Sequence, residues 1–163
     1  MLIGIGSDHI GFKMKELIKH YLVNECGIDV VDVGTNNSSR TDYPIYAEKC
    51  CNLVKKGKVD FGVLICGTGI GMEIAANKIS GIRATVVNDI LSAELSRKHN
   101  NANVVCFGAR IVGTGVAKKI TSTFLMTRFE GGRHKKRLCE IECIENKNML
   151  RFNEIVNQTY ERF

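Results

Sequence analysis

Five short apolar runs alternate with stretches of helical periodicity, and this alternation limits the possible folds more than any other feature of the chain. The runs are rich in Val and Ile and nearly free of polar residues, as strands buried on both faces of a parallel sheet are. They span Leu2–Ser7, Ile28–Val33, Phe61–Ile65, Ala84–Val87 and Val104–Phe107. Apolar residues three and four apart predict helices over Phe12–Glu25, Ile45–Lys56, Met72–Ile79, Leu91–His99 and Gly115–Leu125. The pattern predicts an α/β, three-layer Rossmann-like fold, with a five-stranded parallel sheet flanked by helices.

The last part of the chain keeps a helical pattern but has no further apolar run. We expect C-terminal helices from about Arg133 to about Glu145 and again after about Asn148. We assign one domain to residues 1–147 and a C-terminal helical extension to residues 148–163. Because the extension has an apolar stripe and no strand beside it in sequence, we expect it to dock on the core or on another subunit.

Composition excludes several classes of protein. The 163 residues fit one domain. No apolar run approaches the length of a transmembrane span, and we expect a cytoplasmic protein without a signal peptide or a membrane partner. The seven cysteines are odd in number and lack a C-x-x-C motif, which favours reduced thiols over disulfides. The four histidines are scattered, and we expect no metal and no cofactor. The net charge of +6 is diffuse and aromatic residues are only 7%, which favours a small phosphorylated ligand over nucleic acid.

Polar residues follow the predicted strands where ligands of open parallel sheets bind, at the carboxyl edge. These strand ends read Ser7-Asp8-His9, Gly34-Thr35, Cys66-Gly67-Thr68, Asn88-Asp89 and Gly108-Ala-Arg110. We expect an acid, imidazole and guanidinium set on this one edge. His99 closes the fourth predicted helix, where the helix dipole favours its protonated form.

The segment Cys66-Gly-Thr-Gly-Ile-Gly71 is the strongest candidate for chemistry. A thiol ends a buried strand, and a glycine-rich turn then opens a helix whose first N–H groups attract anions. The thiol can be a nucleophile, a base or a redox centre, or it can simply pack as a small hydrophobe. The turn lacks the Lys of a P-loop, and Met72 replaces the third glycine of a dinucleotide motif. A nucleotide site, with Asp89 on a ribose, and tight strand–helix packing alone both stay open.

Taken together, the motifs resemble the ribose-5-phosphate isomerase type B family, which includes the galactose-6-phosphate isomerase subunits. The resemblance runs in unbroken order to about Glu145. Its motifs are Gly6-Ser-Asp-His-Ile-Gly-Phe12, Asp32-Val-Gly-Thr35, Arg40-Thr-Asp-Tyr-Pro44, Ile65-Cys-Gly-Thr-Gly-Ile-Gly71, Ala75-Ala-Asn-Lys78, Gly81-Ile-Arg83, Ser96-Arg-Lys-His-Asn100, Asn103-Val104, Phe107-Gly-Ala-Arg110 and Glu130-Gly-Gly-Arg-His134.

The resemblance implies an aldose–ketose isomerase that interconverts ribose 5-phosphate and ribulose 5-phosphate through an enediolate. It implies Cys66 as the base, His99 as the acid that opens the sugar ring, and Thr68 as a ligand of the enediolate oxygens. The implied substrate-binding residues are Asp8, His9, Tyr43, Gly67, Thr68, Gly69, Ile70, Gly71, Asn100, Arg110, Arg133 and Arg137, with the three arginines on the phosphate. It also implies a homodimer or tetramer whose active sites lie at the subunit interface.

One branch of the family uses a glutamate of the next helix in place of the cysteine. That position is Met72 here, and Glu73 lies about 100° further around the helix, so we assign the base to Cys66. One chain carries the Cys66 loop, His99 and both Arg133 and Arg137, which favours a pentose phosphate. An isomerase of allose or galactose 6-phosphate, and a non-catalytic phosphosugar- or nucleotide-binding module, are the alternatives.

Overall fold

The protein forms a five-stranded parallel sheet between two layers of helices, which confirms the predicted fold class. The computed structural model describes residues 1–160, and describes the side chains of residues 1–147. The strands are β1 (Leu2–Ser7), β2 (Asp29–Asp32), β3 (Phe61–Cys66), β4 (Ala84–Val86) and β5 (Val104–Gly108). They lie in the order β2-β1-β3-β5-β4, and every neighbouring pair is parallel.

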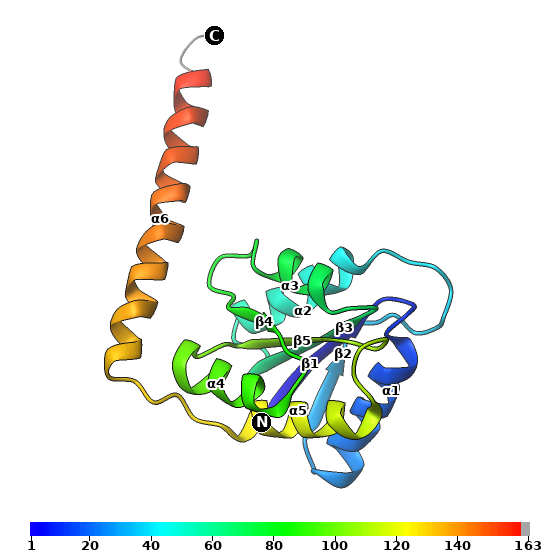
Figure 1. The fold of residues 1–163 in the computed structure, drawn as a ribbon. Helices are drawn as coiled ribbons and strands as arrows, with labels where there is room; N and C mark the ends of the chain where they lie inside the picture. The colour runs from blue at the N-terminus through cyan, green and yellow to red at the C-terminus, as the bar shows by residue number, and fades with distance from the viewer. Residues whose placement is uncertain (161–163) are drawn as a thin grey trace. The chain divides into compact units, whose positions relative to one another are not determined.

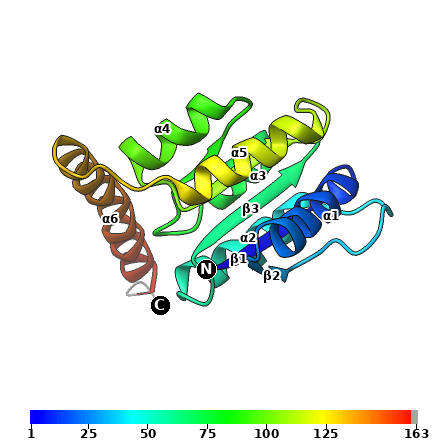
Figure 2. The ribbon, with the colours of Figure 1, turned by 90° about the horizontal axis from the view of Figure 1, so that it is seen from below.

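Helices cover both faces of the sheet (Figures 1 and 2). They are α1 (Phe12–His20), α2 (Tyr43–Lys55), α3 (Ile70–Ala76), α4 (Ile90–Asn100) and α5 (Thr114–Met126). A further helix, α6 (Arg133–Tyr160), follows them in the chain. The core cluster on one face contains residues of α1, α4 and α5, and the cluster on the other contains residues of α2 and α3. Within the described part of the chain, no helix is both long enough and apolar enough to cross a bilayer.

The central strands contribute side chains to both layers, which explains their unbroken apolar runs. In β3, Val63 and Ile65 belong to the cluster beneath α1 and α5, whereas Leu64 and Cys66 belong to the cluster beneath α2 and α3. Alternate residues of a strand point to opposite faces. The thiol of Cys66 therefore lies on the α2–α3 side, at the carboxyl end of the strand.

The order of the strands places the candidate residues at a switch point. The chain leaves β1 for β2 on one side, and β3 lies on the other side of β1. Ligands of open parallel sheets bind where neighbouring connections diverge in this way. The ends of β1 and β3, which pair Ser7 with Ile65, carry Asp8 and the Cys66 loop.

Two differences from the sequence expectations concern helices. The first predicted helix divides at its end, because α1 passes into a π-helical segment over Tyr21–Glu25. The expected break near residues 145–148 is wrong, because α6 is one continuous helix. The segment Glu145-Asn-Lys-Asn148 holds no proline or glycine that would end a helix.

The chain divides by its internal contacts into the units Met1–Phe129 and Glu130–Phe163. The boundary that the sequence suggested at residue 147 falls inside α6. All seven cysteines are free, as expected for reduced thiols. Burial raises the pKa of Cys51 to about 12 and also raises the pKa of Cys106, so these buried thiols stay protonated.

Candidate active site

Cys66 is the last residue of β3, and the residue is 5% exposed. The N–H of Gly69 donates a hydrogen bond to the Cys66 Sγ over 3.1 Å. The sulfur is the acceptor in this bond, which is the polarity that a proton-accepting thiolate requires. Gly69 precedes the first residue of α3, so the N–H groups of that first turn, which have no acceptor within the helix, share the same end of the sheet.

The glycines of this loop are required by its close approach to β5. Gly69 has φ +83°, and a Cβ there would lie 2.8 Å from the carbonyl carbon of Phe107. On the facing strand end, a Cβ on Gly108 would lie 2.6 Å from the Thr68 Cα. The hydroxyl of Thr68 accepts a long hydrogen bond, 3.4 Å, from the N–H of Ile70. The loop is thus pressed against the end of β5 in a conformation that a larger residue cannot adopt.

Tyr43 and Arg110 lie against the same loop. A Cβ on Gly71 would lie 2.7 Å from the ring Cζ of Tyr43, so the phenol packs directly over this glycine. A Cβ on Gly67 would lie 3.7 Å from both the Cδ and an Nη of Arg110. The N–H of Arg110 also donates to the Gly67 carbonyl over 3.1 Å. A phenol and a guanidinium therefore flank the thiol loop.

Asp8 and His9 follow β1 and organise the neighbouring loops. One carboxylate oxygen of Asp8 accepts the N–H groups of Ile10 and Gly11, each over 2.9 Å, and so caps the turn that leads into α1. The Nδ1 of His9 lies 3.1 Å from the carbonyl oxygen of Thr41 and 3.3 Å from its N–H. This contact ties the loop that precedes Tyr43 and α2 to the end of β1.

His99 and Asn100 do not lie on this edge, whereas Asp8, His9 and Arg110 follow strands that end there. The α4 helix leaves the carboxyl end of β4 and returns to the amino end of β5. Its 11 residues span about 16 Å. The carbonyl of the next residue, Asn101, accepts from the side chain of Arg83, which precedes β4. His99 therefore lies at the amino edge of the sheet, across the sheet from Cys66.

Arg133 and Arg137 belong to the unit Glu130–Phe163, where they lie one turn apart at the start of α6. Both side chains are exposed. Within the unit, the Nε of Arg133 makes a 3.4 Å contact with the Nε2 of His134, and His134 lies 3.8 Å from a carboxylate oxygen of Glu130. The pair presents two guanidinium groups on one helix face.

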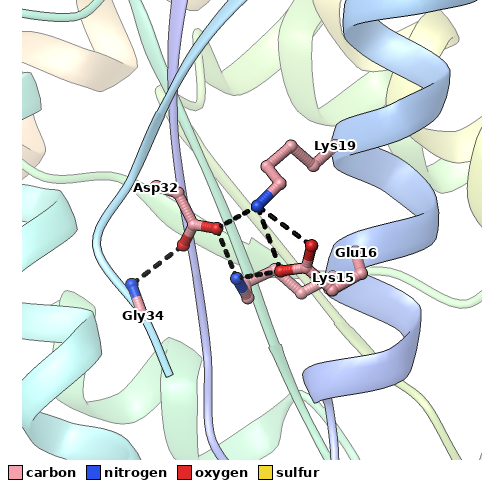
Figure 3. Close-up of polar contacts among 5 residues, drawn as sticks. All are labelled: Lys15, Glu16, Lys19, Asp32 and Gly34. Atoms are coloured by element: carbon pink, nitrogen blue, oxygen red, sulfur yellow. Dashed lines mark hydrogen bonds and ion pairs between the residues drawn. The ribbon is translucent and has the colours of Figure 1, made fainter. Parts of the chain in front are cut away.

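Sequence reasoning missed the ion-pair cluster that supports the carboxyl edge of the sheet, where the Cys66 loop lies. Lys15 is fully buried, and its ammonium contacts Asp32 at the end of β2 over 2.5 Å. Lys19 contacts the same carboxylate oxygen over 2.7 Å, and the other oxygen accepts the N–H of Gly34 over 2.9 Å (Figure 3). Burial opposes ionisation of Asp32, but the two lysines and the Gly34 N–H together lower the pKa of its carboxyl.

Backbone hydrogen bonds connect this cluster to the residues at the end of β1. Gly34, held by Asp32, accepts the N–H of Ser7 over 2.7 Å, and the Thr35 N–H donates to the Ser7 carbonyl. Ser7 directly precedes Asp8. One sequence signal could have revealed the cluster. Lys15 and Lys19 lie four residues apart on the predicted first helix, and Asp32 ends the next strand.

Glu73, the nearest carboxylate in sequence to the loop, has a structural partner. Its Oε1 accepts the N–H of Val86 over 3.0 Å, which fastens α3 to the end of β4. Met72 is fully buried in the core cluster beneath α2 and α3. Both observations agree with the assignment of the base to Cys66.

Comparison with known proteins places the chain in a family. The family model described as Ribose/Galactose Isomerase matches residues 3–141. The chain belongs to the ribose/galactose isomerase family. Among its members, ribose-5-phosphate isomerase B of Escherichia coli is 50% identical over 145 residues, which are 89% of this chain and 97% of that protein.

Solved structures of ribose/galactose isomerases share the fold. The ribose-5-phosphate isomerase B of Clostridium thermocellum has a TM-score of 0.89 at 45% identity and covers 91% of this chain and 99% of its own. That of Mycoplasma genitalium, solved with bound ribulose-5-phosphate, has a TM-score of 0.84 at 41% identity and covers 89% and 96% of the two chains. The predicted family, and an isomerase as the class of enzyme, are confirmed.

Proposed function

We propose that the protein interconverts ribose 5-phosphate and ribulose 5-phosphate, with Cys66 as the proton-transfer base. The observation that carries this proposal is the thiol of Cys66 in a glycine loop that donates to its sulfur and is flanked by Tyr43 and Arg110. The similarity to ribose-5-phosphate isomerases supports the choice of a pentose phosphate.

The reaction moves one carbon-bound proton between neighbouring carbons. The Cys66 thiolate takes the proton from C2 of the open-chain aldose, and the electron pair of that C–H bond forms the C1–C2 double bond of an enediolate. Cys66 then returns the proton to C1, while a hydroxyl proton moves from O2 to O1, so that the ketose forms with no net change of atoms. Thr68 and the N–H groups of Gly67–Gly71 hold the enediolate oxygens, whose charge must be stabilised at this stage.

The remaining residues bind the sugar. Asp8, His9 and Tyr43 position its hydroxyls, and Arg110 takes the phosphate together with Arg133 and Arg137, because guanidinium groups pair with phosphate through two parallel hydrogen bonds. Arg110 already lies beside the loop. The roles of Arg133 and Arg137 rest on the family resemblance.

A second copy of the chain completes this site. His99, the proposed acid that protonates the ring oxygen, and Asn100 lie across the sheet from Cys66 in their own chain, so they serve the Cys66 loop of a partner in a homodimer or tetramer. A cytoplasmic location is a further prediction.

Mixing Cys66→Ala and His99→Asn chains tests the shared site. A 1:1 mixture should recover about a quarter of wild-type activity, because about half of its dimers are hybrids and one of the two sites in each hybrid is intact. No recovery would contradict the sharing.

A substrate panel tests the function. Chelator-treated protein should isomerise ribose 5-phosphate faster than allose or galactose 6-phosphate, and Cys66→Ala should lose about 10²–10⁴-fold of turnover while still binding sugar. Cys139→Ser, at an exposed thiol of α6, is the matched control and should keep full activity. Faster hexose turnover would contradict the substrate, and binding without turnover in the wild type would contradict the enzyme.

A further inference from the structure

Arg97 on α4 is a buried arginine whose partners are not carboxylates. Arg97 is 7% exposed, and its guanidinium carbon lies 4.6 Å from the ring centre of Phe61 and 5.6 Å from that of Phe124. Its Nη1 donates to the Asn101 side chain over 2.8 Å and to the Ala102 carbonyl over 2.5 Å. Burial and the nearby charge of Arg83 lower the pKa of Arg97. Because a buried charge is costly, its fixed contacts call for an explanation beyond packing.

Those contacts converge on the end of α4. Asn101 adopts a left-handed conformation, with φ +44°, and its N–H donates to the Arg97 carbonyl. Its carbonyl accepts both the Nε and an Nη of Arg83, each over 3.1 Å, and its side-chain oxygen accepts from Arg97. Two arginines therefore hold the backbone and the side chain of one residue.

Lys98, His99 and Asn100 are the three residues between Arg97 and Asn101, so both ends of this tripeptide are fixed. An acid must lie within hydrogen-bond reach of the oxygen that it protonates. A displacement of about 1 Å can cost roughly 10²-fold in rate. The end of α4 is held with the precision that such an acid needs.

We propose that Arg83 and Arg97 are positioning residues for ring opening, which act by fixing Asn101 and thereby the imidazole of His99. This inference rests on the proposed function, in which His99 protonates the ring oxygen of ribose 5-phosphate as the bond from C1 to that oxygen breaks. The proton of the C1 hydroxyl is released as the open-chain aldehyde forms. Neither arginine touches the substrate.

The two directions of the reaction separate positioning from folding. Ribose 5-phosphate is a closed furanose that must be opened, whereas ribulose 5-phosphate is open-chain, because its O5 carries the phosphate. Ketose turnover can therefore proceed to the open-chain aldose without the ring-opening acid. A variant that misplaces His99 should lose the aldose direction selectively, whereas a variant that merely unfolds or loses its base loses both directions equally.

The test measures initial rates in both directions for Arg83→Met, Arg97→Met and Asn101→Gly, with His99→Asn as the benchmark. Glycine suits the φ of Asn101 and removes only the side-chain acceptor of Arg97. We expect kcat/KM for ribose 5-phosphate to fall at least about tenfold, with the initial rate from ribulose 5-phosphate within about threefold of wild type. Arg83→Lys should recover part of the loss, because an ammonium can still donate to the Asn101 carbonyl.

Lys118→Met is the matched control, because it also removes one positive charge, here from a surface ion pair between Lys118 and Glu25. The initial rates of this variant should be unchanged in both directions. Equal loss in both directions, or no loss, for Arg83→Met and Asn101→Gly overturns the inference even if Arg97→Met does not fold. Inactive wild-type protein, or a His99→Asn variant without directional loss, instead overturns the proposed function on which the inference rests.

Discussion

The N–H of Gly69 donates to the Sγ of Cys66 over 3.1 Å, and this bond exists because Gly69 adopts φ +83°. The thiol and the turn that opens α3 are therefore one unit, in which a backbone conformation sets the surroundings of the sulfur. Changes to the conformation of Gly69 should affect the chemistry of Cys66 even though the thiol itself is intact.

Gly69→Ala should be more damaging than Gly81→Ala, although the two glycines have nearly equal φ values of +83° and +82°. Both substitutions carry the left-handed cost of ~1–2 kcal/mol. Of the two added Cβ atoms, the one at Gly69 meets backbone atoms of Phe107, whereas the one at Gly81 has no atom within 4 Å. We expect Gly69→Ala to lose ~1–3 kcal/mol more in urea unfolding and most of its turnover. Equal unfolding free energies for the two variants would contradict the close approach to β5.

The contact between Gly71 and Tyr43 predicts strong coupling between the two positions. An added methyl at Gly71 must displace the Tyr43 ring from 2.7 Å, which should raise the KM for the sugar phosphate several-fold. In a Tyr43→Ala background the methyl has space, so Gly71→Ala should have little further effect. A double-mutant cycle measures this coupling, and additive effects on KM would show that the ring does not lie over the glycine.

Asp32→Asn should destabilise the protein by about 3 kcal/mol near neutral pH, because it leaves the buried Lys15 with only the more exposed Glu16 as its counter-charge. The lowered pKa of Asp32 makes its contribution complete above the unfolded-state pKa of about 3.9. The contribution is lost as pH falls from there through the lower folded-state value.

Urea unfolding of wild type and Asp32→Asn between pH 7 and pH 3 checks this dependence. The difference between the two midpoints should shrink below about pH 4. Asp29→Asn, at the exposed start of the same strand, should show almost no difference at any pH. A pH-independent difference for Asp32→Asn would mean that the carboxylate charge is not what stabilises the edge.

Much of this site follows from patterns that sequence can carry. The apolar runs predicted the strands, because residues such as Leu64 and Ile65 are buried on opposite faces of the sheet. The glycines of the Cys66 loop predicted a tight strand–helix turn. Parallel topology then brought Asp8, Cys66 and Arg110 to one edge.

Two features needed the structure. The position of His99 across the sheet depends on the direction in which α4 crosses, which the residue type does not signal. The burial of Lys15 and Arg97 also escaped prediction, because lysine and arginine in an amphipathic helix normally face solvent. Only the neighbouring acid and aromatic rings explain their positions.

The central claim is that Cys66 moves the proton between C1 and C2, and exchange of substrate hydrogen with D₂O tests it most directly. With ribose 5-phosphate and wild-type protein, proton NMR should show loss of the C2 hydrogen as the enediolate passes its proton through the thiol. Cys66→Ala should slow this loss by at least about 10²-fold, with Cys139→Ser unchanged. Exchange at the wild-type rate in folded Cys66→Ala would contradict the account.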